Sequence, residues 1–255
     1  MEQHGNSLNT RMIPGYRGTM LAVHELGEGR PLLLLHGLFS SAQINWIKFG
    51  HAAAIAAQGF RVIMPDFRVH GQSASSHAPE DYPRDVLIRD VNLLIDALGL
   101  VDFDLGGFSL GARTTAMLLA EGLRPRRAIL AGMGLEGLSE WGRRRDFFLS
   151  VIEDRETIKH GDPRWLSVQF MRTMKVDTEA AVLLLNSFGE FDPSVLKTVT
   201  VPTLVICGDD DRDNGSPEAL VQLLPDAQFA EIPGTHMGSV THKELGTSIA
   251  HFLAN

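Results

Sequence analysis

"DFDLGGFSLGARTTAMLLAEG", residues 102 to 122, joins a short apolar run to a helical pattern with almost no loop between them. The run over 102–108 predicts a strand, and the alanine- and leucine-rich run over 110–122 predicts a helix. Gly107, Ser109 and Gly111 stand at the junction in the pattern G-x-S-x-G. Between a strand and a helix, this pattern is typical of a nucleophile elbow, a strained turn that presents a serine hydroxyl clear of a sheet.

The position of each residue in this elbow predicts its role. Ser109 is the candidate nucleophile, and the backbone N–H of Leu110, the next residue, would point at an oxyanion. Gly107 and Gly111 are expected because the sharp turn brings its neighbours so close to the serine that a Cβ would clash.

The rest of the chain alternates between strand-length apolar runs and longer helical patterns, which favours an α/β sheet with mostly parallel strands. Strands are expected over 20–27, 31–37, 61–67, 102–108, 127–133, 202–208 and 228–234. Helices are expected over 51–60, 84–100, 110–122 and 241–255. The run over 31–37, "PLLLLHG", is apolar throughout, as expected for a strand that is buried on both faces.

The strand pattern stops between about Leu135 and Leu196, where three helical segments follow one another at 137–154, 163–174 and 178–191. An all-helical insertion in an α/β chain is typical of a lid over the site. We therefore expect an α/β core over 1–134 and 197–255 and a helical lid over 135–196. The alternative is a set of ordinary helices that cover the edge of the sheet.

A serine hydroxyl needs a base in contact with it and a second oxyanion donor. His36 ends the predicted strand 31–37, and we expect it to orient its loop through hydrogen bonds. Gly37 would let that loop turn beside the elbow, so that the N–H of Leu38 becomes the second donor. The better base is His236 in "IPGTHMG", because the chain order serine, acid, histidine is that of α/β hydrolases.

Four aspartates follow the predicted strand 202–208, in "CGDDDRDNG" at 207–215. A calcium loop would require glycine at its sixth position and glutamate at its twelfth. Counted from Asp209, these positions hold Asn214 and Leu220. We therefore expect neither a metal site nor a cofactor.

The same aspartates can supply the acid that orients the base, and that carboxylate must be buried. Asp211 is the first choice because it comes three residues after the glycine that ends the strand. Asp209 is the second choice, and Glu136, which follows the preceding strand, is an alternative. Asp210 and Asp213 are expected to be solvated or to form the turn.

Composition narrows the class of protein. The 255 residues carry a formal net charge of −8 and are 44% hydrophobic, which allows a large core and argues against nucleic acid as the main partner. The basic runs 124–127 and 143–145 are interpreted as solvated faces or helix-end charges. Cys207 is the only cysteine, so it forms no disulfide within the chain and is expected to be a buried core thiol.

The N-terminal stretch is polar, and no stretch reaches the roughly 20 apolar residues of a membrane helix. We expect a cytoplasmic protein that is a monomer or a homodimer and that binds a small hydrophobic molecule.

With these motifs in place, the chain resembles the α/β-hydrolase superfamily, in its serine esterase and lipase-like form, over essentially its full length. The resemblance is carried by "HGLF", "DFRVHGQS", "GFSLG", "CGDDD" and "PGTHMG" in the family's order. It implies a sheet of about eight strands, the triad Ser109–Asp211–His236 and an oxyanion hole formed by Leu38 and Leu110. The sequence departs from the family at Val69, where relatives commonly carry glycine. The serine excludes the haloalkane dehalogenase branch, which requires an aspartate nucleophile.

The implied reaction is hydrolysis of a small to medium hydrophobic carboxylic ester through an acyl-enzyme. The predicted lid contains a set of large apolar side chains that could form the wall of the substrate site or could pack the lid onto the core. They are Trp141, Phe147, Phe148, Trp165, Phe170, Met171 and Met174.

Three other functions use the same motifs. A carbon–carbon bond hydrolase of ring-cleavage products has a similar loop to "HGLFSSAQINW", including Asn45 and Trp46, although its extra glycines are absent here. A cofactor-free perhydrolase or haloperoxidase would carry the same triad. A small-molecule receptor on a hydrolase scaffold is the alternative from outside the enzymes.

Overall fold

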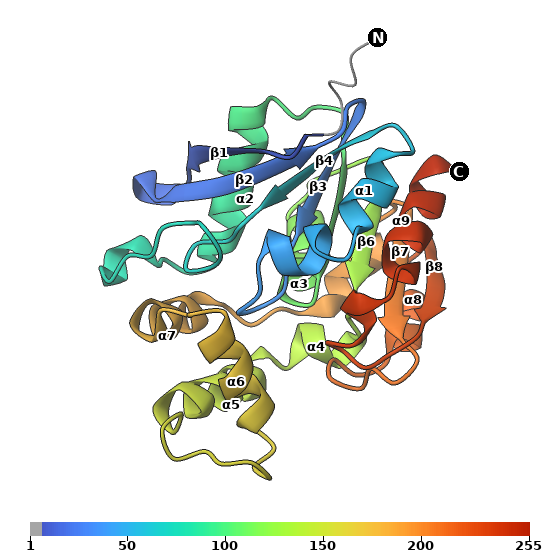
Figure 1. Cartoon of the computed structure of the whole chain (residues 1–255). Helices are drawn as coiled ribbons and strands as arrows, with labels where there is room; N and C mark the ends of the chain where they lie inside the picture. Colours follow the sequence, from blue (N-terminus) through green and yellow to red (C-terminus); the bar gives the residue numbers. More distant parts are fainter. Residues whose placement is uncertain (1–6) are drawn as a thin grey trace.

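One eight-stranded sheet organises residues 7–255, which are the residues that the computed structural model describes (Figure 1). The strand order is β1-β2-β4-β3-β5-β6-β7-β8. The strands are β1 (Asn9–Pro14), β2 (Met20–Leu26), β3 (Arg30–Leu35), β4 (Phe60–Pro65), β5 (Asp104–Phe108), β6 (Ala128–Ala131), β7 (Thr203–Gly208) and β8 (Ala227–Ile232). β2 runs antiparallel to both β1 and β4, and the pairs from β4 to β8 are parallel. The prediction of a mostly parallel α/β sheet of about eight strands is confirmed.

Helices cover both faces of this sheet. They are α1 (His51–Ala56), α2 (Val86–Leu98), α3 (Leu110–Ala120), α8 (Pro217–Leu223) and α9 (Glu244–Ala254). β3 shows why its run of leucines is buried: Leu32 and Leu34 belong to the apolar core with Ile55 of α1, whereas Leu33 and Leu35 belong to the core with α2. Successive strand side chains point to opposite faces, so a strand covered on both sides is apolar at every position.

Two elements of the α/β core, one strand and one helix, escaped the sequence analysis. β1 is an edge strand with five of its six residues exposed, so it lacks the alternation of apolar and polar residues that marks a half-buried strand. α8 begins at Pro217, and the side chain of Ser216 accepts a hydrogen bond from Ala219 N–H at its N-terminus. A proline in the first turn and a serine cap are signals that could have predicted this helix.

Four helices lie between β6 and β7, where three helical segments were expected. They are α4 (Leu135–Ser139), α5 (Trp141–Glu153), α6 (Trp165–Thr173) and α7 (Thr178–Ser187). The extra helix arises because the backbone breaks at Glu140, with φ −108° and ψ 41°. In Figure 1, α5, α6 and α7 stand apart from the sheet, below it.

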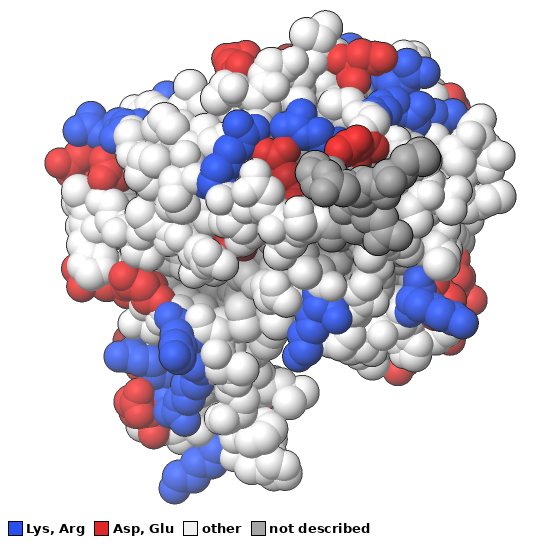
Figure 2. Space-filling model, turned by 45° about the horizontal axis from the view of Figure 1, so that its top comes forward, with Lys and Arg blue, Asp and Glu red and all other residues white. Residues whose placement is uncertain are grey.

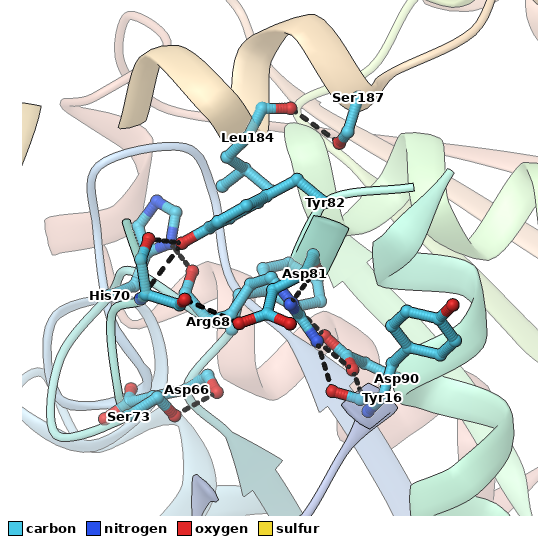
Figure 3. A network of polar contacts seen from close by, with 12 residues as sticks. Tyr16, Asp66, Arg68, His70, Ser73, Asp81, Tyr82, Asp90, Leu184 and Ser187 are labelled. Atoms are coloured by element: carbon cyan, nitrogen blue, oxygen red, sulfur yellow. Dashed lines mark hydrogen bonds and ion pairs between the residues drawn. The ribbon is translucent and has the colours of Figure 1, made fainter. Parts of the chain in front are cut away.

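The loop after β4 contains the one visible departure from the family pattern. Val69 has a φ of 72°, a left-handed conformation that costs a β-branched residue considerable strain and that glycine adopts freely. Neighbouring Arg68 fixes the loop, because its guanidinium donates to both carboxylate oxygens of Asp90 at 2.6 and 2.7 Å (Figure 3). Both side chains of this ion pair are 1% exposed, so the strained loop is fastened to α2 from inside the protein.

The helices, the surface charge and the single cysteine can be compared with what the composition predicts. No helix within residues 7–255 combines the length and the apolar character that crossing a membrane requires. On the face drawn in Figure 2, basic and acidic side chains lie close to one another. Cys207 is buried in β7, and burial raises the pKa of its thiol to about 12.

Candidate active site

Ser109 occupies a sharp turn between β5 and α3, with φ 53° and ψ −110°. A Cβ on Gly107 would lie 2.3 Å from the carbonyl carbon of Gly111, and a Cβ on Gly111 would lie 2.3 Å from the carbonyl oxygen of Leu35. Glycine is therefore required at both positions. The clashing atoms belong to the backbone of α3 and β3, whereas the sequence analysis expected them to belong to the serine.

His236 and Asp211 approach Ser109 from two other loops. His236 follows β8, and its Nε2 lies 3.0 Å from the Ser109 Oγ. Its Nδ1 lies 2.8 Å from the Asp211 Oδ2 in the loop after β7. All three side chains are buried, so the hydrogen-bonded chain is shielded from water. Burial alone would raise the pKa of Asp211, but the hydrogen bond and charge of His236 lower it. The carboxylate is therefore ionised at neutral pH.

The remaining acidic candidates contact other partners. Among the aspartates of 207–215, Asp211 alone is buried, while Asp209, Asp210 and Asp213 are exposed. Asp209 accepts a hydrogen bond from Gly234 N–H at 2.8 Å. Glu136 accepts one from Ser216 N–H at 2.8 Å. Within residues 7–255, no cluster of three His, Cys, Asp or Glu side chains is arranged to hold a metal ion.

Two backbone N–H groups are available beside the serine. Leu38 and Leu110 both line the cavity at Ser109. Leu110 is the first residue of α3, where a backbone N–H has no partner within the helix. No residue in the described part of the chain accepts a hydrogen bond from Leu38 N–H. Both groups are therefore free to donate to an oxygen atom.

The loop that carries Leu38 is held on both sides. The Asn45 Oδ1 accepts a hydrogen bond from Gly37 N–H at 2.9 Å, and the His70 Nε2 accepts one from Phe39 N–H at 2.9 Å. Phe39 itself has a φ of 57°, so this contact holds a residue that is not in a relaxed conformation. Asn45, which resembled a residue of carbon–carbon bond hydrolases, serves here to hold the loop backbone.

His36 contacts backbone on both of its ring nitrogens. Its Nε2 accepts from Phe67 N–H at 2.9 Å, which leaves Nδ1 to donate to the Gly37 carbonyl at 2.7 Å. Burial lowers the pKa of this imidazole, so it is neutral at pH 7. The structure thus places His36 where the sequence analysis expected it, as a support of the loop.

A small cavity of about 10 Å³ opens at Ser109 between the sheet and the helices after β6. Its walls are largely apolar. They are formed by Leu38, Ser109, Leu110, Arg113, Met133, Gly137, Trp141, Arg144, Phe148 and Asn214.

Comparison with known proteins identifies the family. The family model described as alpha/beta hydrolase fold matches residues 30–171. The chain belongs to the alpha/beta hydrolase fold family. It is accordingly a hydrolase of the alpha/beta fold.

Relatives of this α/β hydrolase differ in their reactions. It is 28% identical to the AB hydrolase superfamily protein YisY of Bacillus subtilis (strain 168), over 75% of this chain and 78% of that protein. It is 24% identical to the non-heme chloroperoxidase CPO-A1 of Kitasatospora aureofaciens, over 87% of this chain and 90% of that protein. The solved esterase EaEST of Exiguobacterium antarcticum has the same fold, with a TM-score of 0.78, 18% identity and coverage of 97% of this chain and 100% of that chain. The family is therefore known, whereas the similarity to these relatives does not identify the substrate.

Only part of the predicted apolar wall reaches the cavity of this hydrolase. Trp141 and Phe148 line it, and the other five side chains of the predicted set, Met174 among them, do not. Phe147 is 39% exposed and packs edge-on against Phe148, and Trp165 packs against His160. Met171 is buried in the apolar core that the lid helices share with α2 and the sheet, and Phe170 packs against that core. The lid helices bury apolar side chains against one another and against the core, and residue spacing does not show which of these side chains faces the site.

Five cavity residues were missing from the sequence analysis: Arg113, Met133, Gly137, Arg144 and Asn214. Arg113 could have been found, because it follows Ser109 by four residues on α3 and so lies one helical turn further along the same face. Arg144 corrects an earlier interpretation. The run 143–145 is interpreted from the sequence as a solvated face or as helix-end charges rather than a binding patch, yet Arg144 is half-buried and lines the cavity.

Proposed function

We propose that this α/β hydrolase cleaves a small to medium carboxylic ester with a largely apolar body through a covalent acyl-enzyme. The observation that carries the proposal is the buried chain of hydrogen bonds from Asp211 through His236 to Ser109, which lines a cavity with largely apolar walls. A serine paired with a histidine, itself oriented by a carboxylate, is the arrangement that activates a hydroxyl for acyl transfer.

In the proposed mechanism, the Ser109 Oγ attacks the ester carbonyl carbon while the His236 Nε2 takes the hydroxyl proton. Asp211 holds the Nδ1–H tautomer of His236 and stabilises the imidazolium that forms. The N–H groups of Leu38 and Leu110 donate to the oxyanion of the tetrahedral intermediate. His236 then protonates the departing alkoxide, which leaves as the alcohol. A water molecule, deprotonated by His236, attacks the acyl-enzyme, and the acid is released with Ser109 regenerated.

The helices of 135–196 act as the lid in this proposal, with the α/β core formed by 1–134 and 197–255, of which residues 1–6 lie outside the described part of the chain. Trp141, Arg144 and Phe148 of α5 form one wall of the cavity, and Ser109 and Leu110 form the other. A volume of about 10 Å³ holds roughly one water molecule. Side chains of the lid must therefore move before an ester can reach Ser109.

The proposal is tested by labelling and turnover in the same preparation. We expect a fluorophosphonate probe to add one phosphonyl group to Ser109, located by mass spectrometry of peptides, and p-nitrophenyl butyrate to be hydrolysed. Ser109→Ala should lose both properties, with kcat/KM lower by about 10⁴-fold or more. Ser139→Ala, at an exposed serine outside the cavity, is the control and should retain both. Turnover that survives in Ser109→Ala would contradict the mechanism, and binding of an ester without turnover would favour a receptor.

A second reaction is favoured by the likeness to a non-heme chloroperoxidase over most of both chains. Hydrogen peroxide in place of water can attack the same acyl-enzyme, which releases a peracid and regenerates Ser109. The assay supplies acetate and hydrogen peroxide with bromide and monochlorodimedone, and loss of the dye's absorbance reports the peracid. Activity that exceeds ester hydrolysis and that disappears in Ser109→Ala would make perhydrolysis the main function.

A further inference from the structure

We propose that the ester taken by this hydrolase carries an ionised carboxylate, which Arg113 and Arg144 bind at the cavity beside Ser109. The inference deepens the proposed function and rests on it, because it names the substrate class of the same site. It adds one negative charge to a substrate body that otherwise fits apolar walls.

Arg113 is a buried cation without a carboxylate partner. Its side chain is 3% exposed, and no Asp or Glu oxygen in the described residues lies within ion-pair distance. Its Nη2 donates to the Gly189 carbonyl at 2.6 Å and its Nη1 contacts the Met117 Sδ at 3.0 Å, while its Nε has no partner. Burial lowers the pKa of Arg113 to about 10, so the group is still charged at pH 7. A buried charge is costly unless an opposite charge accompanies it.

The other deeply buried arginine of the protein shows what a structural role looks like here. Arg68 is 1% exposed, and it meets both oxygens of Asp90. Arg113 differs from it in two respects. It lines the cavity at the nucleophile, and its hydrogen bonds go only to a carbonyl and a thioether, while the carboxylates of Asp85 and Glu190 raise its pKa from beyond ion-pair distance. No carboxylate of the described residues is in direct contact with Arg113, so the contrast indicates that an anion in contact with it comes from the cavity.

Arg144 brings a second cation to the same cavity from α5. It donates to the Asp213 carbonyl at 2.8 Å and forms no ion pair with a residue of 7–255. Its neighbours in the sequence do form ion pairs, Arg143 with Glu140 at 2.7 Å and Arg145 with Asp146 at 3.0 Å. The charge of Arg144 also contributes to lowering the pKa of Arg113, so the two guanidinium groups repel each other. An anion between them would remove that repulsion.

A third, neutral donor lies at the same place. Trp141 is buried, its Nε1–H has no partner, and the guanidinium of Arg113 lies 5.2 Å from the centre of its ring. In the described residues, seven buried side-chain polar atoms lack a hydrogen-bond partner, and three of the seven belong to residues that line this cavity. Two of these three are donors, Arg113 Nε and Trp141 Nε1. The third such atom in the cavity, Asn214 Oδ1, is an acceptor and would suit a hydroxyl group rather than the anion.

A carboxylate matches this set of donors. It has two oxygens that accept two or more hydrogen bonds each, and the planar guanidinium binds it through paired N–H groups. Arg113 reaches the cavity from the core helix α3, and Arg144 reaches it from the lid helix α5. A bound carboxylate would therefore also join the lid to the core over the nucleophile.

The test compares two esters of equal chain length, monomethyl adipate and methyl hexanoate, by acid release at pH 7.5. We expect kcat/KM to be at least about tenfold higher for the half-ester, since hydrogen bonds to a charged group are worth that factor or more. Arg144→Gln and Arg113→Gln should each lower this ratio at least about tenfold. Arg143→Gln removes a neighbouring arginine that is exposed and lies outside the cavity, so it should leave the ratio unchanged.

Because Arg113 is buried, its glutamine variant could fail to fold. Arg113→Lys keeps the charge but loses the paired N–H groups, and it should lower the ratio less than Arg113→Gln does. Calorimetry with adipate gives a readout that does not depend on turnover: adipate should bind the wild type and should bind Arg144→Gln at least about tenfold more weakly.

The outcomes separate the two proposals. Absence of any ester turnover and of labelling at Ser109 would overturn the proposed function, while the adipate titration would still test the carboxylate. Hydrolysis of methyl hexanoate at a rate equal to that of the half-ester, with an unchanged ratio in Arg144→Gln, would overturn the carboxylate inference and leave the serine mechanism in place.

Discussion

At the scale of single residues, burial separates chemically identical side chains. The four aspartates of 207–215 are equal in intrinsic acidity, yet Asp211 alone is buried and hydrogen-bonded to His236. Its backbone N–H donates to the Gly208 carbonyl at 3.0 Å, which turns the chain back under the end of β7. The same turn leaves Asp209 and Asp210 facing solvent.

This difference predicts the effect of removing single charges. Asp211→Asn should lower kcat by about 10³ to 10⁴-fold, because an amide neither fixes the Nδ1–H tautomer of His236 nor stabilises its cation. Asp210→Asn and Asp213→Asn change exposed side chains and should alter kcat by less than about twofold. Steady-state hydrolysis of p-nitrophenyl butyrate measures all three. Equal losses in the three variants would show that the acid has been wrongly assigned.

At the scale of elements, the loop after β3 presents the Leu38 N–H only because other elements hold it. Asn45, in the helical turn Gln43–Ile47, accepts from Gly37 N–H, and His70, in the loop after β4, accepts from Phe39 N–H. The loop is thus clamped one residue before and one residue after Leu38. Such a clamp keeps an oxyanion donor in position before the reaction begins. A donor that is already in position stabilises the oxyanion most effectively, because it does not have to reorient during the reaction.

Cutting one side of the clamp should reduce kcat more than it affects substrate binding. Asn45→Ala leaves the buried Gly37 N–H without an acceptor and lets the loop shift, so we expect kcat to fall about tenfold with KM within about threefold. Thermal unfolding should show a loss of about 1 to 3 kcal/mol for the unpaired group. Gln43→Ala, an exposed position in the same turn, is the matched control. A rise in KM at constant kcat would show that Asn45 acts on substrate binding instead.

At the scale of the whole molecule, several histidines are buried in the neutral form beneath the site. Burial, together with the neighbouring His36, lowers the pKa of His70 to about 3, against the opposing effects of the Arg68 carbonyl and Asp66. Burial likewise lowers the pKa of His36 and of His51. In the unfolded chain these rings take up a proton near pH 6.5. The unfolded state therefore binds more protons below that pH, and the folded state loses stability as the pH falls.

The free energy of unfolding should decrease between pH 6.5 and pH 5, with His70 alone contributing about 2 kcal/mol of the loss. Urea unfolding at pH 7.5 and pH 5.0 measures the difference. His70→Gln keeps an acceptor for Phe39 N–H but does not titrate, so its difference should be smaller by about that amount. The pKa values of Asp66 and Asp211 are lowered in the folded protein, so the stability that these carboxylates contribute is lost only below the ordinary pKa of an aspartate. They therefore do not affect the change in stability between pH 6.5 and pH 5. An identical pH dependence in the variant would contradict the account.

Much of the architecture was predictable from local patterns. The strand-turn-helix pattern around Ser109, the all-apolar run of β3 and the glycine-bounded helices are properties of short segments, and the structure agrees with them. β1 was missed because an exposed edge strand carries no apolar pattern, and α4 was missed because a break at Glu140 leaves no clear mark in the sequence.

The sequence by itself determined the fold, because periodicity and turn chemistry act over a few residues, and it named Ser109, Asp211 and His236 because each follows a strand in the family's order. Only the tertiary structure decided which side chains face the nucleophile. It removed Phe147, Trp165, Phe170 and Met171 from the cavity wall and brought in Arg113 and Arg144. The physical reason is that a lid helix can turn any of its faces toward the core. That choice depends on packing between segments far apart in the chain, so only the tertiary structure shows that Arg144 of the lid joins Arg113 at the cavity.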